Sequence, residues 1–315
     1  MNFGITMKER DLHMRLGVFL FIALIVGTAS CTQAESLLLC GRKSVHLARV
    51  TTATEGQAGV DFLWDWTAEK SPEIPESMRA MFATTDECKP VGDGSRILIT
   101  SSSQGCAVVE YPSGKTLWYA QVANAHSIEL LPKDRLVVAS SVSPQGNQLI
   151  LFDMARSNQP LSSVPLPSGH GVVWDATRER LWALGSDELQ CHTLENWDSN
   201  KPSLAIQDRY PLPDQDGHDL QPVPDSNDLM ITTGKHVFLF DRETHQFRAH
   251  PELGPRGRVK SVSMHPETKR VVFVQSGEEQ WWSHSMELLS PQQTITLPGH
   301  DLYKARWFPE NPANP

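Results

Sequence analysis

A repeat of about 43 residues is the feature that most constrains what this chain can fold into. Six similar segments follow one another at steps of 39 to 48 residues. They begin at Glu87, His126, His170, His218, Lys260 and Tyr303, and four of them reach a proline six residues later. A period of this length is typical of folds in which one small supersecondary unit recurs and buries its apolar face against the next copy.

The units are made of short strands rather than helices. Apolar, mostly β-branched runs such as residues 96–100, 135–139 and 270–274 are bounded by glycine, asparagine, aspartate or proline, which favours strands separated by tight turns. Long amphipathic helical patterns are nearly absent, and residues 75–82 are the one short helix candidate because Pro75 suits a helix start. Four antiparallel strands fit one repeat, as in a propeller blade.

The two ends of the chain complement each other. The sixth unit contains only its first strand, residues 303–308, whereas residues 36–40, 45–50 and 60–64 supply three strands that lack a first one. Joining them completes a sixth blade and removes two free sheet edges. We therefore predict an all-β fold, a six-bladed β-propeller of four-stranded antiparallel blades closed by the C-terminal first strand and the N-terminal strands; a seventh blade is the main alternative.

The blade starts add a resemblance. Ala125-His126-Ser127, Gly169-His170-Gly171 and Gly217-His218-Asp219 share a small residue before histidine. The sequence resembles the six-bladed β-propeller superfamily and, through these blade starts, an uncharacterised group of exported bacterial propeller proteins. The resemblance covers nearly the whole chain after residue 34 and implies the propeller fold; it names no substrate.

The first 34 residues have the pattern of an export signal. Arg15 precedes an eleven-residue apolar run, residues 16–26, which is too short to span a bilayer and is followed by small residues. Cleavage after Ala34 would release a soluble protein, whereas Thr28-Ala29-Ser30-Cys31 resembles a lipobox that would leave a lipid anchor on Cys31. We expect a periplasmic or extracellular protein whose residues 35–315 form one propeller domain; a buried core helix is the remaining alternative for the apolar run.

Charge and composition argue against two kinds of partner. The formal net charge is −9, so the basic surface that nucleic-acid binding requires is not expected. No second apolar run is present, so we expect no membrane span after residue 34. The cysteines that follow the signal, Cys40, Cys88, Cys106 and Cys191, form no CxxC pair and are interpreted as small buried hydrophobes.

The candidate site is a ring of polar side chains. The first strand of each blade lines the central channel, so equivalent positions on six blades meet at one mouth. The predicted ring is Glu87, His126, His170, His218, Lys260 and Tyr303, with Lys304 and Arg306 beside it. No nucleophile elbow, zinc-protease or phosphate-loop motif is present, so no catalytic residue is assigned.

Three functions remain open for this ring. Its basic groups suit a small polar or anionic ligand, such as an acidic saccharide. Alternatively, His126, His170 and His218 hold one divalent transition metal, with Gln221 and Glu129 supporting the shell, as in a metal-dependent polysaccharide lyase or hydrolase. The third alternative is a protein-interaction scaffold, since channel walls touch water and are polar without further function. Trp281-Trp282 is either a sugar platform or a pair with one core and one outward ring.

Overall fold

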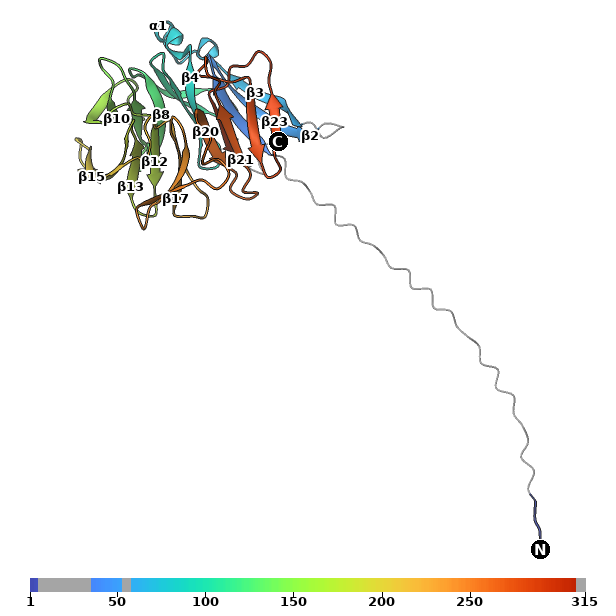
Figure 1. Cartoon of the computed structure of the whole chain (residues 1–315). Coiled ribbons are helices and arrows are strands. Elements are labelled where there is room, and N and C mark those ends of the chain that lie inside the picture. Colours follow the sequence, from blue (N-terminus) through green and yellow to red (C-terminus); the bar gives the residue numbers. More distant parts are fainter. Residues whose placement is uncertain (5–34, 53–57, 310–315) are drawn as a thin grey trace. The chain divides into compact units, whose positions relative to one another are not determined.

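The computed structural model describes residues 1–4, 35–52 and 58–309 (Figure 1). The chain divides into two units, Met1–Gln33 and Ala34–Pro315, and the architecture below belongs to the second. The predicted signal features, including Cys31 and the cleavage site after Ala34, lie outside the described residues. Within the described ranges, no helix has the length and apolar character needed to cross a membrane.

The described part of the second unit contains six sheets of four antiparallel strands each, which confirms the six-bladed β-propeller. The inner strands are β24 (Lys304–Phe308), β4 (Thr85–Val91), β8 (Ala125–Leu131), β12 (Gly171–Asp175), β16 (Asp219–Pro222) and β20 (Val259–Met264). The second strands are β1 (Ser36–Gly41), β5 (Arg96–Ser101), β9 (Arg135–Ser140), β13 (Arg180–Leu184), β17 (Asp228–Thr232) and β21 (Val271–Gln275). The third strands are β2 (Ser44–Thr52), β6 (Gly105–Glu110), β10 (Gln148–Asp153), β14 (Glu188–Glu195), β18 (Val237–Asp241) and β22 (Ser285–Leu289). The outer strands are β3 (Ala58–Trp66), β7 (Thr116–Gln121), β11 (Pro160–Pro165), β15 (Ser203–Pro211), β19 (Gln246–Ala249) and β23 (Gln293–Thr296).

One blade joins the two ends of the propeller sequence, as predicted. Its strand order is β24-β1-β2-β3, and the antiparallel register runs from Lys304 opposite Cys40 to Phe308 opposite Ser36. The pairing covers the sheet edges that β24 and β1 would otherwise present to solvent or to another chain. It also brings side chains of β24 into the channel.

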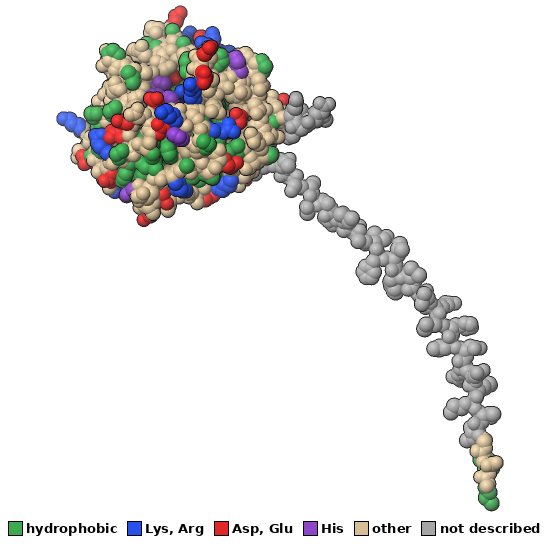
Figure 2. Space-filling view, in the orientation of Figure 1, with side chains coloured by type: hydrophobic (Ala, Val, Ile, Leu, Met, Phe, Trp, Pro, Cys, Tyr) green, Lys and Arg blue, Asp and Glu red, His purple; other side chains and the backbone are tan. Residues whose placement is uncertain are grey.

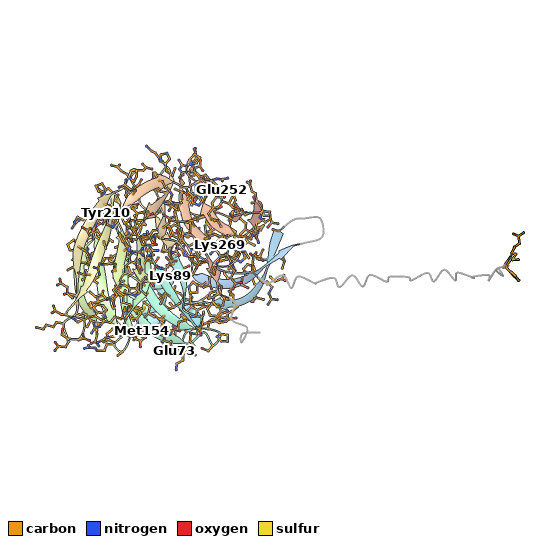
Figure 3. All side chains as sticks on the ribbon, turned by 90° about the horizontal axis from the view of Figure 1, so that it is seen from below. Glu73, Lys89, Met154, Tyr210, Glu252 and Lys269 are labelled. Carbon is orange, nitrogen blue, oxygen red and sulfur yellow. The ribbon has the colours of Figure 1, made fainter. Side chains whose placement is uncertain are left out.

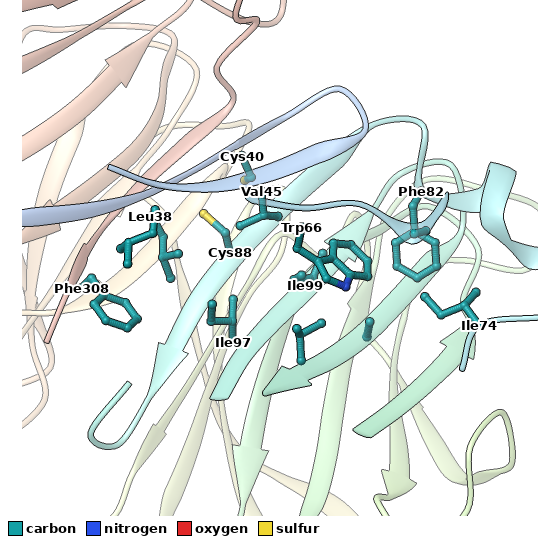
Figure 4. Close-up of a cluster of buried hydrophobic side chains, with 14 of the residues drawn as sticks. Leu38, Cys40, Val45, Trp66, Ile74, Phe82, Cys88, Ile97, Ile99 and Phe308 are labelled. Atoms are coloured by element: carbon teal, nitrogen blue, oxygen red, sulfur yellow. The ribbon is translucent and has the colours of Figure 1, made fainter. Parts of the chain in front are cut away.

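Apolar clusters between neighbouring blades form the core. One of them joins the closing blade to the β4 blade through Leu38, Trp66, Ile97 and Phe308, all nearly inaccessible to solvent (Figure 4). The helix predicted in residues 75–82 is present as α1 (Glu76–Arg79) and the 3-10 turn η2 (Ala80–Phe82); a second 3-10 turn, η1, spans Ala68–Lys70. η2 inserts Phe82 into the same cluster, where its ring and the Trp66 ring form a T-shaped pair.

The four cysteines of the described residues are free and buried, which confirms their interpretation as small core residues. Cys40 and Cys88 lie in the cluster of Figure 4. On the surface, acidic and basic side chains are interspersed over the face shown in Figure 2, and they form no extended basic patch there.

Candidate functional site

The predicted ring is present, with one residue replaced. Near the start of β4, β8 and β20, the pairing of the inner strand with the second strand shifts by one residue. The second residue of each of these inner strands therefore has no partner on the second strand. In the other blades, the equivalent residue directly precedes the paired strand and donates its N–H to the second strand or its end. The ring is therefore Asp86, His126, His170, His218, Lys260 and Tyr303.

Glu87 lies one residue beyond the ring. Glu87 pairs with Thr100 on the second strand of its blade. In two other blades, Lys304 and Asp219 occupy the equivalent position and pair with Cys40 and Thr232. Aligning the repeats by sequence misses this shift because residues 86 and 87 are both acidic and no small residue precedes the blade start. Since successive side chains of a strand alternate between its two faces, this step of one residue moves Glu87 from the mouth into the channel interior.

The three histidines form a continuous row across neighbouring blades. The ring centroids of His126 and His170 are 4.3 Å apart with an interplanar angle of 28°, and those of His170 and His218 are 5.3 Å apart with an edge-on angle of 74°. Asp86 flanks one end, with Oδ1 3.6 Å from His126 Nδ1. Lys260 flanks the other, with Nζ 3.0 Å from His218 Nε2. Sequence spacing predicted this convergence.

The hydrogen bonds of the row assign its donors and acceptors. His170 Nδ1 lies 2.9 Å from the carbonyl oxygen of Ser168, which places a proton on Nδ1 and leaves a lone pair on Nε2. The Lys260 ammonium donates to His218 Nε2, so the proton of that imidazole is on Nδ1. Nδ1 of His126 and of His218 is buried and has no hydrogen-bond partner among the described residues.

Burial keeps the imidazoles neutral. It lowers the pKa of His170 to about 4, and it holds the pKa values of His126 and His218 well below 6.5. Burial also lowers the pKa of Lys260 to about 8 and raises that of Asp86 to about 7. At neutral pH the mouth thus presents uncharged imidazoles, the ammonium group of Lys260 and the partly ionised carboxyl group of Asp86.

This geometry does not suit a metal ion. An imidazole binds metal through an in-plane lone pair, and the stacked rings of His126 and His170 do not aim their lone pairs at one point. In the described part of the chain, no group of three or more histidine, cysteine, aspartate or glutamate side chains is arranged to hold one. Gln221 and Glu129, expected to support the shell, line the other end of the channel instead.

Replacing His170 tests the burial of the row. The folded pKa lies below the unfolded value of 6.5, so the unfolded state binds a proton first as pH falls, and stability is lost between pH 6.5 and 4. When the pH falls from 7 to 5, we expect the unfolding free energy of the parent protein to decrease by about 2 kcal/mol more than that of His170→Gln. Urea unfolding at the two pH values measures the difference.

Asp86 has the opposite pH dependence, because its raised pKa makes the folded state take up the proton first, but it is present in both proteins and cancels. Equal pH dependence of the two proteins would contradict a buried, neutral His170.

Lys304 and Arg306 are buried inside the channel rather than placed on its rim. Both side chains are at most 1% exposed and share the carboxylates of Glu87 and Asp219. Arg306 donates from Nε and Nη2 to Glu87 at 2.9 and 3.1 Å, and from Nη1 and Nη2 to Asp219 at 2.7 and 2.6 Å. Lys304 Nζ lies 3.3 Å from Glu87 and 3.0 Å from Asp219. We call these four residues the channel ion cluster.

A cavity of about 410 Å³ opens beside the row, between the β16 and β20 blades. It is lined by His218 and Lys260 of the row and by the segment that leads to Trp281. The remaining polar lining is Asp216, Arg258, Ser276, Glu278, Glu279 and Gln280. The cavity therefore combines cationic donors, carboxylate acceptors and an indole ring within reach of the ring residues.

Sequence reasoning missed several residues of this region. In the alignment of the repeats, Glu87 takes the place of the neighbouring Asp86, and Asp219 enters only as part of a blade start although it follows His218 directly. Asp216 and Arg258 precede the ring positions of their blades by two residues. A search for charged residues at that offset would have found them.

The comparisons with known proteins agree with the fold. The structure is similar to a chain of the "Crystal structure of Nidogen/Laminin Complex", with a TM-score of 0.57, 11% sequence identity, and coverage of 87% of this chain and 98% of that one. At this identity the likeness concerns the fold alone. No curated protein matches the sequence. One family model, described as "Family of unknown function (DUF6528)", matches residues 18–314. The chain belongs to this family, DUF6528, and folds as a six-bladed β-propeller.

Proposed function

We propose that this protein is an exported β-propeller that binds an acidic saccharide at the channel mouth bearing the histidine row. The observation that carries the proposal is the position of Lys260, which touches His218 and lines the 410 Å³ cavity next to Trp281. Export rests on the apolar run after Arg15 and the small residues that follow it.

The cavity lining holds two cations, Lys260 and Arg258, that offer partners to a ligand carboxylate, and three carboxylates that offer acceptors to ligand hydroxyl groups. The ammonium of Lys260 is paired with a neutral imidazole rather than with a carboxylate, so its charge is available to an anion. Arg258 makes only a 3.8 Å contact with the exposed Glu278 and adds a second cation. Asp216 and Glu279 supply acceptors for hydroxyl groups. A uronate sugar carries both kinds of group.

An exposed aromatic ring completes the set. Trp281 is 39% exposed, and the buried Tyr303 meets it edge-on at 5.5 Å and 67°. One indole face remains for stacking on a sugar ring, whose C–H groups form a flat apolar surface. Trp282 instead packs near His284 and under the Arg42 guanidinium. The two neighbouring indoles thus have different surroundings, and of the two it is Trp281 that lines the cavity.

Binding of a galacturonate oligosaccharide tests the proposal. We expect it to bind more tightly than the matched neutral galactose oligosaccharide, and Lys260→Met to weaken binding at least tenfold because the largely buried cation of the cavity is lost. Isothermal titration measures both. Lys133→Met, which removes an exposed lysine paired with Asp198, is the control and should bind like the parent.

Trp281→Ala gives a second, independent variant. It should weaken binding of the same oligosaccharide while leaving the urea unfolding midpoint unchanged, because the ring is exposed. If the acidic and neutral oligosaccharides bind equally, or if neither variant differs from the parent, the proposal is wrong and the scaffold alternative gains support.

The affinity should also fall as pH rises. The pKa of Lys260 is about 8, so most molecules carry the ammonium at pH 7 and about one in ten does at pH 9. The uronate remains ionised throughout this range. We expect the apparent affinity for the galacturonate oligosaccharide to fall roughly tenfold from pH 7 to pH 9, and Lys260→Met to show no such fall. Titration at three pH values measures it.

A further inference from the structure

The other mouth of the channel holds a second cavity, of about 310 Å³. All six inner strands reach it at the position three residues beyond the ring, which corresponds to about 10 Å along a strand. These floor residues are Lys89, Glu129, Val173, Gln221, Ser263 and Arg306. In Figure 3, Lys89 lies toward the middle of the molecule. The cavity shares no lining residue with the one beside Lys260.

The walls of this cavity are apolar. They are formed by one partly buried indole, one buried indole, a methionine and five prolines, namely Trp174, Trp307, Met264, Pro90, Pro222, Pro224, Pro266 and Pro309. Proline rings and indole faces present rigid C–H and π surfaces, which bind flat apolar faces of small ligands with little loss of conformational entropy.

The charges on the floor are already paired. Lys89 Nζ donates to Glu129 Oε2 at 3.0 Å and to the carbonyl oxygen of Val172 at 2.7 Å. The guanidinium of Arg306 is held by the two carboxylates of the channel ion cluster. Counted together, the floor and the channel ion cluster hold three cations and three carboxylates: Lys89, Lys304 and Arg306 against Glu129, Glu87 and Asp219. An ionised ligand therefore finds no free counter-charge here. The chemistry favours an uncharged ligand.

One buried donor on the floor lacks a partner. Gln221 is 9% exposed, and its Nε2 makes no hydrogen bond to any described residue. A buried amide NH₂ without an acceptor destabilises the fold, so we expect its acceptor to come from outside the chain. The oxygens of Glu129 accept from Lys89 Nζ and from the N–H of Leu130, so the nearby carboxylate is engaged.

We propose that this second cavity binds a small uncharged ligand whose amide carbonyl accepts a hydrogen bond from Nε2 of Gln221 while its apolar face packs on Trp174 and the prolines. An acetamido sugar and a short peptide both carry such a carbonyl. The inference is independent of the proposed function, because the two cavities lie at different mouths and the ligands differ in charge.

Side-chain amide signals of the ¹⁵N-labelled protein provide the test. N-acetylglucosamine represents the sugar source, N-acetylglycinamide the peptide source, and glucose lacks the amide. We expect one amide probe to shift the Gln221 NH₂ signals with a dissociation constant on the order of 1 mM, at least tenfold tighter than glucose. The probe that binds more tightly identifies the source of the carbonyl.

Gln221→Leu is the decisive variant. It removes a buried donor without a partner, so we expect an equal or higher urea midpoint together with loss of probe binding. Gln246→Leu, on the outer strand of the same blade, is the matched control and should bind like the parent. Equal binding of glucose, unshifted Gln221 signals, or full binding by Gln221→Leu would each overturn the proposal; the signals of the parent decide even if the variant does not fold.

Discussion

Arg306→Met should lower the free energy of unfolding by about 3–5 kcal/mol. The guanidinium is 1% exposed and forms paired hydrogen bonds to both Glu87 and Asp219. Its removal leaves two buried carboxylates with only the ammonium of Lys304 between them, and the cost of an unpaired buried charge far exceeds that of a lost surface pair. Urea unfolding at pH 7 measures the change.

Arg248→Met is the matched control. The side chain of Arg248 is 51% exposed, and its partner Asp228 is largely buried but keeps a hydrogen bond from the Ser226 hydroxyl when Arg248 is lost. The loss of Arg248 should therefore cost less than about 1 kcal/mol. Adding Asp219→Asn to Arg306→Met should recover part of the loss, because one of the unpaired charges is then removed. If Arg306→Met costs no more than Arg248→Met, the channel ion cluster does not hold the blades together.

The pH dependence gives a second measure of the same cluster. The Arg306 and Lys304 charges lower the pKa of Glu87 to about 2, and they hold the pKa of Asp219 well below its usual range. A carboxylate whose folded pKa is depressed adds stability above its unfolded pKa of about 4, and this stability is lost as pH falls toward 2. Arg306→Met should therefore lose less further stability between pH 5 and pH 3 than the parent.

Trp118→Ala should also lower the unfolding free energy by about 3–5 kcal/mol. The side chain is 0% exposed and packs between the β4 and β8 blades, with its ring edge-on to Phe152 at 5.2 Å and 69°. The strands cannot move inward to fill the cavity left by the indole without breaking their backbone hydrogen bonds. The free energy of the cavity therefore adds to the lost transfer free energy of the side chain. Thermal and urea unfolding measure the change.

Trp281→Ala uses the same substitution at an exposed site and should change stability by less than about 0.5 kcal/mol. The pair separates the loss of blade packing from the loss of a ligand platform. Comparable destabilisation by both substitutions would contradict the burial that distinguishes the two indoles.

The fold was predictable in detail because its information is local and repeated. Short apolar runs such as residues 96–100 and 270–274 correspond to β5 and β21, and the unpaired first strand at residues 303–308 identified the closing blade. The same strand pattern recurs in each repeat, so a strand that is hard to recognise in one unit can be assigned from its equivalents in the other units.

The site was predictable only to within one residue. The equivalence of His126, His170 and His218 followed from the repeat, and the structure brings these rings together, with His126 stacked on His170 and His170 edge-on to His218. The exchange of Asp86 for Glu87 was not predictable, because it depends on a β-bulge that the residue types do not encode. Alternation along the strand then decides which of two adjacent acids faces the mouth.

The blade number, the closure of the ring and the three histidines that meet at one mouth all follow from the amino-acid sequence, because strand length and repeat spacing specify them. The distribution of charges depends on the tertiary structure instead. Lys304 and Arg306 look like rim cations in the sequence, yet the channel buries them against Glu87 and Asp219, which lie 217 and 85 residues from Lys304 along the chain. The burial and ion pairing of these side chains depend on the inner strands of all six blades together. A local sequence pattern does not determine which opposite charge lies across the channel.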